Sequence, residues 1–402
     1  MWSSKHKFTI PPEKYRAWAE IDLDNAAHNF HKVRSATESK ICCVIKANAY
    51  GHGAVQLAKL YQACGADYIA VSNIQEALQL RRQRITLPIL ILGYSSSRCA
   101  KLLADHHITQ CVFSYEYGME LARAAAEARV TVKIHIKIDT GMGRIGFLCR
   151  DATHNELEAV AEVCRQPHLD PEGIFTHFAA ADEGECGDTY THEQFSLFSG
   201  AIDRLASLGV TFPIRHCANS AAIFDHPECH LDMVRAGIVL YGLSPSAQLR
   251  NRPELRPVMS LRSVISHIKT VRADETVSYG RTYAAPAERR IATVPIGYAD
   301  GFSRSVGQSG YCLCVSGQSA PIVGRVCMDQ LMLDVTDTDC RIGDEIVVFG
   351  DTPPFTADYI AELAHTVNYE VVCDVGKRVP RVFVRDGEII EWKDDILGES
   401  FP

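Results

Sequence analysis

Short apolar runs rich in β-branched residues recur through the first 242 residues, and the segments between them have helical spacing. In "AVQLAKLYQACG", apolar residues at 54, 55, 57, 58 and 61 form one face of a helix. Eight runs are typical of buried β-strands: 41–47, 68–72, 88–92, 110–114, 132–139, 173–178, 214–219 and 233–242. Eight strands alternating with helices predict an α/β fold, an N-terminal (β/α)8 TIM barrel. An open doubly wound sheet is the alternative, but no G-x-G-x-x-G follows the first strand, which disfavours dinucleotide binding.

The pattern changes near residue 250, where "SAQLRNRPELRPV" has the polar, proline-containing composition of a linker. Beyond it, short strand-like runs follow one another with turn signals between them, as in an all-β domain. One helical pattern, at 356–368, interrupts them. We therefore predict a barrel over residues 15–250 and a mainly β domain over 251–402, against which residues 1–14 pack.

Composition narrows the class of protein. The 402 residues are 47% hydrophobic and 22% charged, and no apolar stretch approaches the roughly 20 residues that span a bilayer. The N-terminus has no apolar segment of the kind found in secretory signals. A net charge of −8 disfavours a nucleic-acid partner. The 15 cysteines include no C-x-x-C pair and lie mostly in apolar runs, which indicates buried thiols in a reducing cytoplasm and no metal site.

Catalytic groups of a barrel lie where its strands end and in the loops that follow. Residues that could carry chemistry gather at these ends: Lys46, Lys137, Arg144, His177, His216, Asn219, Ser220 and Arg235. Lys46 ends the first strand, and a partly desolvated lysine has a lowered pKa and can form a Schiff base. The alternative is an ordinary rim lysine that extends to water.

The run "CANSAA", with Asn219 and Ser220, supplies amide and hydroxyl donors at an expected helix N-terminus, which favours a phosphate. Backbone N–H groups around Gly237 can do the same, although Ser220 could be a plain N-cap. Arg144, in a glycine-rich loop, suits a carboxylate or phenolate. Arg235 lies in an apolar strand and needs a partner, for which His216 is our candidate. A Schiff-base lysine beside a phosphate site indicates pyridoxal 5′-phosphate.

The motifs at these positions resemble those of the alanine racemases, pyridoxal-phosphate enzymes with a TIM barrel and a β domain. The segment around the cofactor lysine is "VIKANAYGHG". Further blocks match in order along the chain: "KIDTGMGRIG", "THFAAADE", "HCANSAA", "VRAGIVLYGL", "VSYGRTYAA", "PIGYADGFSR", "VGRVCMDQ" and "NYEVVCDVGKRVPR". The resemblance runs from about residue 17 to about residue 385, and the first dozen residues show none.

The resemblance implies a role for each matching residue. Lys46 would hold the cofactor as a Schiff base, Arg235 would donate to its pyridine nitrogen, and Arg144 would contact its phenolic oxygen and the substrate carboxylate. The other cofactor-binding positions are Tyr50, His177, Asn219, Ser220, Gly237, Ile238 and Tyr369. His216 would stand behind Arg235, and His177 behind the tyrosine base.

The same resemblance implies a two-base racemisation in a homodimer. Lys46 would serve one face of the substrate and Tyr279 of the other subunit the opposite face, while Met328 would bind the substrate carboxylate through its N–H. Lys137 would be carbamylated and would orient Arg144; a strand lysine that faces elsewhere is the alternative. We add Arg281 as a cationic neighbour of Tyr279, because we expect both on one face of a strand.

The expected reaction is the interconversion of L- and D-alanine in the cytoplasm, which supplies D-alanine for peptidoglycan. A serine or broad-specificity racemase of the same fold is the alternative, since the barrel motifs are shared. A related decarboxylase would carry a cysteine base and longer specificity loops, which we do not find. A barrel-type pyridoxal-phosphate carrier would lack residues 255–402.

Overall fold

The computed structural model describes residues 16–397 and 399–401, which form two compact units. The barrel unit comprises Ala27–Ala49 and Ala54–Leu255. The β unit comprises the described residues up to Ala26, Tyr50–Gly53, and those from Arg256 onward. The prediction that residues 1–14 pack against the β domain concerns residues outside those that the structure describes.

The barrel unit contains eight parallel strands that hydrogen-bond in the order β10-β2-β3-β4-β5-β6-β8-β9. Their bounds are β2 (Lys40–Val44), β3 (Tyr68–Val71), β4 (Ile89–Ile91), β5 (Ile108–Val112), β6 (Val132–Asp139), β8 (Leu169–Phe175), β9 (Ile214–His216) and β10 (Met233–Ala236). The short β7 (Phe147–Leu148) pairs beside β6. Between β9 and β10, the N–H groups of Asp232 and Arg235 donate to the carbonyls of Arg215 and Ala218, at 3.1 and 3.0 Å. These bonds join the ends of the sheet, so the predicted barrel is confirmed.

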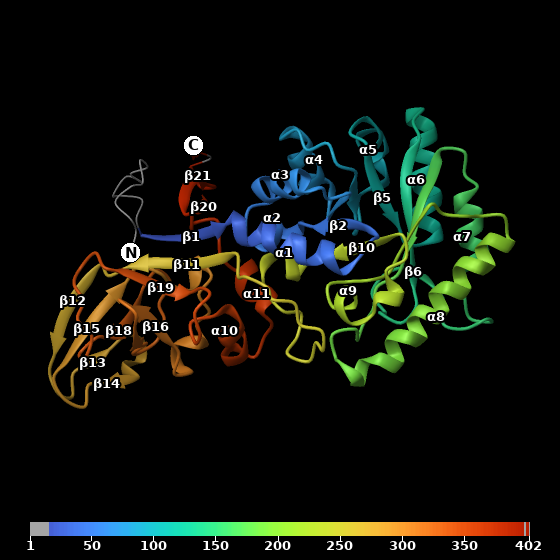
Figure 1. The fold of residues 1–402 in the computed structure, drawn as a ribbon. Coiled ribbons are helices and arrows are strands. Elements are labelled where there is room, and N and C mark those ends of the chain that lie inside the picture. The colour runs from blue at the N-terminus through green and yellow to red at the C-terminus, as the bar shows by residue number, and fades with distance from the viewer. Residues whose placement is uncertain (1–15, 398, 402) are drawn as a thin grey trace. The chain divides into compact units, whose positions relative to one another are not determined.

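Helices lie around these strands (Figure 1). They are α1 (Leu23–Ala36), α3 (Ala54–Cys64), α4 (Ile74–Arg82), α5 (Ala100–Asp105), α6 (Tyr115–Ala128), α7 (Leu157–Cys164), α8 (Glu185–Ser207) and α9 (Ala222–Asp225), with the 3-10 turns η2 (Ser97–Cys99), η3 (Pro227–Cys229) and η4 (Ile238–Tyr241). Local chemistry sets several helix starts: the side chains of Asn73 and Ser114 accept N–H groups in the first turns of α4 and α6. Four of the eight barrel strands, β3, β4, β5 and β10, are buried along their whole length, and β2 and β6 are buried except for one lysine each, which is why these strands appear in the sequence as nearly continuous apolar runs.

The β unit has an eight-stranded sheet in the order β17-β16-β19-β11-β1-β20-β21-β22 and smaller sheets β12-β15-β18 and β13-β14. The strands are β1 (Ala17–Asp22), β11 (Met259–Val264), β12 (His267–Val271), β13 (Thr276–Val277), β14 (Tyr283–Ala284), β15 (Arg289–Val294), β16 (Cys312–Val315), β17 (Gln318–Pro321), β18 (Leu331–Asp334), β19 (Glu345–Phe349), β20 (Arg381–Arg385), β21 (Glu388–Asp394) and β22 (Glu399–Phe401). Its helices are α10 (Ala357–Ala364) and α11 (Asn368–Cys373), and its 3-10 turns are η5 (Tyr279–Arg281), η6 (Tyr298–Asp300) and η7 (Val306–Gln308). The predicted mainly β architecture is confirmed.

Three local predictions need correction. β1 lies inside the range 15–250 assigned to the barrel, but it pairs antiparallel with β11 and parallel with β20 of the β unit. The strand expected over 233–242 ends at Ala236, because Gly237 (φ −116°, ψ −108°) leaves the strand conformation and η4 follows. The first barrel strand ends at Val44, so Lys46 lies beyond the strand and does not end it.

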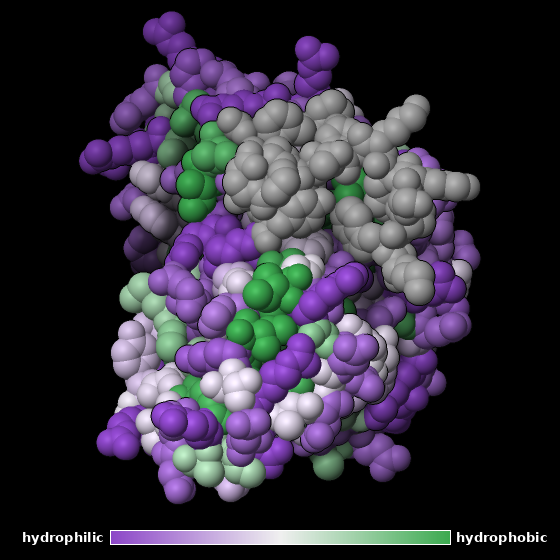
Figure 2. Space-filling model, turned by 90° about the vertical axis from the view of Figure 1, so that its left-hand side faces the viewer, coloured by the Kyte–Doolittle hydropathy of each residue, from purple (hydrophilic) through white to green (hydrophobic). Residues whose placement is uncertain are grey.

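Figure 2 shows one face of the molecule, on which hydrophilic side chains predominate and hydrophobic ones gather in small groups. Among the described residues, no helix combines the length and the apolar character needed to cross a membrane.

Candidate active site

Lys46 begins a left-handed helical turn, α2 (Lys46–Tyr50). Ala47, Asn48 and Ala49 have φ of 51°, 54° and 56°, and the turn closes with the Ala49 N–H donating to the Ile45 carbonyl at 2.9 Å. A left-handed conformation costs roughly 1–2 kcal/mol for each residue with a side chain. Such strain persists only where surrounding contacts enforce it, and it is typical of functional sites.

Two polar side chains of the barrel unit hold this turn. Glu76, in the first turn of α4, accepts the N–H of Ala47 through Oε1 (2.8 Å) and the N–H of Ser72 through Oε2 (2.7 Å). Asn48 Oδ1 accepts the N–H of Ala54 at 2.9 Å, which fixes the start of α3. Glu76 was not predicted to belong to the site, because it is 30 residues away from Lys46 along the chain.

The last residue of the turn and the three that follow it, Tyr50–Gly53, belong to the β unit. The rings of Tyr50 and Tyr369 lie 6.0 Å apart, and burial raises the pKa of Tyr50. Gly51 has φ +83°, and a Cβ there would lie 2.2 Å from the Val372 carbonyl oxygen, so only glycine fits. The buried Arg381 guanidinium donates to the Gly51 carbonyl at 2.9 Å. These contacts explain why glycine follows the tyrosine in "AYGHG".

Arg235, at the end of β10, is buried and hydrogen-bonded as its apolar strand required. Its Nη1 donates to His216 Nδ1 at 2.9 Å, and its Nη2 donates to His177 Nδ1 at 3.1 Å and to the carbonyls of Thr176 (2.9 Å) and Cys217 (3.0 Å). Burial lowers the pKa of Arg235 to about 10, so the guanidinium remains charged at neutral pH. Its Nε–H has no hydrogen-bond acceptor within the described residues and is available to a ligand.

Both histidines beside Arg235 are neutral. Burial, and after it the Arg235 charge, holds the pKa of His177 and of His216 well below the ordinary range. Since arginine only donates, each ring accepts through Nδ1 and carries its proton on Nε2. His216 stacks on Phe175, with ring centroids 4.9 Å apart and planes 7° apart. The predicted pairing of His216 with Arg235 is present, and His177 shares it.

The hydrogen bonds continue from His216 into the barrel core. His216 Nε2 lies 2.9 Å from His135 Nδ1, and His135 Nε2 lies 3.5 Å from Glu172 Oε2. Glu172 also accepts from Tyr68 Oη at 2.5 Å and from Lys133 Nζ at 2.6 Å. The sequence analysis missed His135 and Glu172. For His135 the period-2 pattern of "VKIHIKID" was a usable signal, because it places His135 on the same face as Lys137.

Lys137, on β6, is buried. Its Nζ donates to the Ile138 carbonyl at 2.7 Å and lies 5.5 Å from the centre of the Phe175 ring. Burial, with a smaller effect from the charge of Arg235, lowers the pKa of Lys137 to about 7. A substantial fraction of this amine is therefore neutral and nucleophilic near physiological pH.

Arg144 is exposed in the loop after β6, and no hydrogen bond or ion pair holds it within the described residues. Asp139 shapes this loop: its Oδ1 accepts the N–H groups of Gly141 and Gly143 at 3.0 and 3.1 Å, and its Oδ2 pairs with Arg150 at 3.2 Å. The loop is thus fixed at its base while its arginine is left available to a ligand.

Asn219 and Ser220 have different local roles. Asn219 Oδ1 accepts the N–H of Ala222 at 3.0 Å, so Asn219 caps the turn at residues 219–222. Ser220 Oγ instead accepts the N–H of Gly237 at 2.9 Å, which joins the loop after β9 to the loop after β10. The plain N-cap alternative for Ser220 is therefore wrong. Ile238 begins η4, where the first N–H groups have no partner within the helix.

Tyr279 and Met328 lie on neighbouring segments of the β unit, and their side chains are 69% and 53% exposed. Ser278 donates to the Arg325 carbonyl at 2.6 Å and lies 3.6 Å from Cys327 Sγ, which holds the two segments together. Within the described residues, neither the Tyr279 hydroxyl nor the Met328 N–H has a hydrogen-bond partner.

The geometry assumed for Arg281 is wrong. Residues 279–281 form the 3-10 turn η5, with φ of 71° at Gly280 and 52° at Arg281, so Tyr279 and Arg281 do not share a strand face. Arg281 Nε donates to Thr276 Oγ1 at 3.2 Å. The alternation rule failed here because the glycine and its neighbour turn the chain.

Outside this region, the described residues contain one group of side chains suited to a metal ion, namely His192, His226 and Glu228. No metal site was predicted from the sequence, because His192 is on α8 and the other two residues follow α9, more than 30 residues later.

A (β/α)8 barrel with a buried, charged arginine and two lysines at its rim, followed by a β domain, is the architecture of a class of pyridoxal-phosphate enzymes. Comparison with known proteins identifies the group. Residues 21–245 match the model of the alanine racemase N-terminal domain, and residues 258–383 match that of the C-terminal domain. The chain belongs to the alanine racemase family, so the resemblance drawn from the motifs is confirmed.

Individual relatives are similar over nearly their whole length. An alanine racemase of Clostridium tetani is 43% identical, over 93% of this chain and 96% of the relative. One of Desulfovibrio desulfuricans is 47% identical, over 91% and 98%. The solved alanine racemase of Clostridium difficile 630 has a TM-score of 0.89 at 41% identity, covering 96% and 99%. That of Bacillus anthracis, solved with bound L-Ala-P, has a TM-score of 0.89 at 37% identity, covering 95% and 98%.

Proposed function

We propose that this chain interconverts L-alanine and D-alanine with pyridoxal 5′-phosphate as its cofactor. The observation that carries the proposal is Arg235. It is a buried, charged guanidinium, held by two neutral histidines and two carbonyls, and its Nε–H is left for a ligand atom that accepts. A pyridine nitrogen is such an acceptor. Family membership supplies the reaction.

The other residues assigned to the cofactor also fit it. Lys46 would form the Schiff base, and the strained turn that follows it fixes its position. The Ser220 hydroxyl and the N–H of Ile238 offer donors to a phosphate, and Gly237, whose N–H donates to Ser220 Oγ, would orient that hydroxyl. Tyr50 and Tyr369 would add hydroxyl donors, while Asn219 and His177 line the same strand ends.

Racemisation requires a proton to leave one face of Cα and to return on the other. When bound, pyridoxal phosphate withdraws electrons from the substrate and so makes the Cα proton acidic. The Lys46 amine would hold or deliver a proton on one face, and the Tyr279 hydroxyl would do so on the other. Two fixed bases avoid moving one base around the substrate, and each can contribute about 10²–10⁴-fold.

Arg144 and Met328 would hold the substrate carboxylate, the first through its guanidinium and the second through its N–H. Lys137 would be carbamylated: CO₂ adds to the neutral amine, an N–C bond forms and one proton leaves. The product is an anion that would attract Arg144, whereas an unmodified ammonium would repel it. The lowered pKa of Lys137 supports this step.

We further propose a homodimer in which Tyr279 and Met328 of one subunit complete the site of the other. Their exposure and their lack of partners within the described residues support this. All fifteen cysteines are free thiols, which supports a reducing, cytoplasmic location, where the product would serve peptidoglycan synthesis.

Borohydride reduction of the purified enzyme, followed by peptide mapping, tests the cofactor site, and the adduct should lie on Lys46 alone. The activity is tested by incubating the protein with L-alanine and quantifying D-alanine by chiral chromatography, with L-serine in parallel. Equal amounts of L- and D-alanine at equilibrium are expected. Failure to form D-alanine while the Lys46 adduct is present would refute the substrate and leave the cofactor assignment intact.

A further inference from the structure

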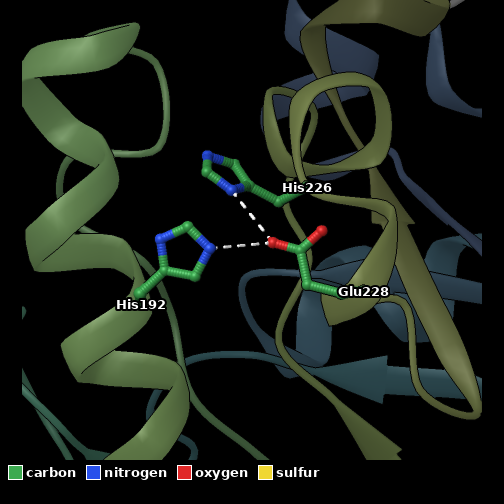
Figure 3. Close-up of side chains that lie close together, drawn as sticks. All are labelled: His192, His226 and Glu228. Carbon is green, nitrogen blue, oxygen red and sulfur yellow. Dashed lines mark hydrogen bonds and ion pairs between the residues drawn. The ribbon is translucent and has the colours of Figure 1, made fainter.

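Two histidines and a glutamate converge on the outside of the barrel unit (Figure 3). Glu228 Oε1 lies 3.1 Å from His192 Nε2 and 3.3 Å from His226 Nδ1, and all three potential ligand atoms lie within 4.8 Å of one another. His192 belongs to α8, whereas Glu228 is in η3 and His226 immediately precedes it. His226 is buried, and the other two side chains are exposed.

Asp188, one turn before His192 on α8, orients both histidines. Its backbone carbonyl lies 2.8 Å from His192 Nδ1, and its carboxylate Oδ1 lies 3.4 Å from His226 Nε2. Arg250 fixes that carboxylate with two bonds, of 2.6 and 3.0 Å. In protein metal sites, the nitrogen that does not bind the metal almost always donates to a carbonyl or a carboxylate. Asp188 provides one of each.

If both histidines donate to Asp188, no N–H group remains at the centre of the cluster. A neutral imidazole has one N–H and one lone pair. If each neutral ring directs its N–H at Asp188, His192 Nε2 and His226 Nδ1 both turn lone pairs toward Glu228 Oε1, which is also an acceptor. Three acceptor atoms at this distance are held together only by a cation between them, either a metal ion or a proton on one of the rings.

We propose that His192, His226 and Glu228 form a binding site for a divalent transition-metal ion of the Zn²⁺, Co²⁺ or Ni²⁺ type. Two imidazole nitrogens and one carboxylate oxygen are a common ligand set for these ions. Metal–ligand distances of about 2.0–2.1 Å require ligand atoms roughly 3.4 Å apart in a tetrahedron. The two separations from Glu228 Oε1 are already close to this value. Exposure of His192 and Glu228 leaves a fourth position to water.

The ion would tie α8 to the segment 222–229. That segment connects the loop of Ser220 to the strand of Arg235, so the metal would stabilise the part of the barrel that joins these two residues. The proposal rests on the geometry of the barrel unit and does not depend on the proposed reaction.

The test is calorimetric titration of chelator-treated holoenzyme with Zn²⁺, repeated with Co²⁺ under visible absorption. Wild type is expected to bind one equivalent that His192→Gln and Glu228→Gln lose, and Zn²⁺ should raise the melting temperature of wild type but not of these two variants. Asp188→Asn should weaken this equivalent about 10–100-fold without abolishing it. His106→Gln removes an exposed histidine far along the chain from the cluster and should behave as wild type.

Retained cofactor absorbance and near-ultraviolet circular dichroism identify variants that are folded. If folded His192→Gln and Glu228→Gln bind Zn²⁺ with the stoichiometry and affinity of wild type, the proposal is overturned and protons alone hold the cluster. A Co²⁺ spectrum showing thiolate ligation would overturn it as well, because it would place the ion on cysteines. Loss of the equivalent in both variants, with nitrogen and oxygen ligation in wild type, would establish the site.

Discussion

At the residue scale, Arg235 sets the direction of a buried chain of hydrogen bonds because its guanidinium only donates. His216 accepts through Nδ1, so its Nε2–H donates to His135 Nδ1, and the Nε2–H of His135 then points at Glu172. The arginine at one end thus sets the position of each proton in this hydrogen-bonded series, and the Glu172 carboxylate lies 3.5 Å from His135 Nε2 at the other end. Glu172 therefore takes part in fixing the histidine that supports Arg235, although it lies away from the rim.

We expect Glu172→Gln to lower the free energy of unfolding by about 2 kcal/mol at neutral pH, because hydrogen bonds to a partly buried charge are lost. Burial alone would raise the pKa of Glu172, but His135, Lys133 and Tyr68 hold it well below its ordinary value. A carboxylate with a depressed pKa stabilises the fold above its unfolded pKa, near 4.3, and less as pH falls through its folded value. Urea unfolding at pH 7, 5 and 3.5 should show a difference that is constant above pH 5 and then narrows.

The matched control is Glu158→Gln, since Glu158 pairs with Arg204 at 2.9 Å where both side chains are more than half exposed. Little change is expected, because exposed ion pairs contribute little to stability. A Glu172→Gln difference that persists unchanged at pH 3.5 would contradict the role given to the carboxylate charge.

Lys137 should bind CO₂ in a pH-dependent way. Its pKa of about 7 means that the reactive neutral amine predominates above that pH and is protonated below it. With ¹³C-bicarbonate, we expect a carbamate carbon signal in the NMR spectrum at pH 8 that is lost by pH 5.5. Lys137→Gln should abolish the signal.

The control for this prediction is Lys133→Gln, two residues away on β6, because Lys133 pairs with Glu172 and its pKa is raised. That variant should keep the carbamate signal. A signal that survives in Lys137→Gln would assign the modification to another lysine.

At the element scale, the left-handed turn after Lys46 depends on groups outside itself. Glu76→Ala removes the acceptor of the Ala47 N–H, so the turn loses a charge-assisted hydrogen bond and can relax toward less strained backbone. We expect weaker cofactor retention and a lower kcat, with a smaller effect on the melting temperature. Cofactor absorbance after dialysis and the rate of racemisation measure these effects.

Glu116→Ala is the matched control. Glu116 occupies the first turn of α6 as Glu76 does in α4, but it does not hydrogen-bond to the turn at Lys46. It should retain cofactor as wild type does. Equal losses in the two variants would mean that Glu76 acts only through the stability of its helix.

The strands and helices of the barrel could be predicted because their burial has a simple period, but the turn at Lys46 could not. Nothing in "KANAY" requires positive φ at two alanines; Glu76, far along the chain, stabilises it. Arg235 could be predicted to have a partner, because a charged side chain in an apolar strand needs one. The link from His216 through His135 to Glu172 could not be predicted, because it depends on the registers of three strands. At Tyr279 and Arg281, a strand period was assumed where a glycine turns the chain.

At the scale of the whole molecule, the β unit is assembled from segments at both ends of the sequence. β1 pairs in parallel with β20, more than 350 residues later, and separates it from β11 in the sheet. The β unit therefore needs the start of the chain as well as its end. Local sequence could not show this, because an apolar strand carries no mark of the sheet that it joins.

The proposed sharing of active sites can be tested by mixing inactive variants. If Lys46 and Tyr279 of one site come from different subunits, a dimer of Lys46→Ala with Tyr279→Phe has one site with both defects and one with neither. Half of randomly assorted dimers are mixed, so roughly a quarter of wild-type activity should return after co-refolding. If both residues act within one subunit, every site keeps one defect and nothing returns. Mixing Lys46→Ala with the double variant is the control, because no assortment of that pair restores a complete site under either arrangement.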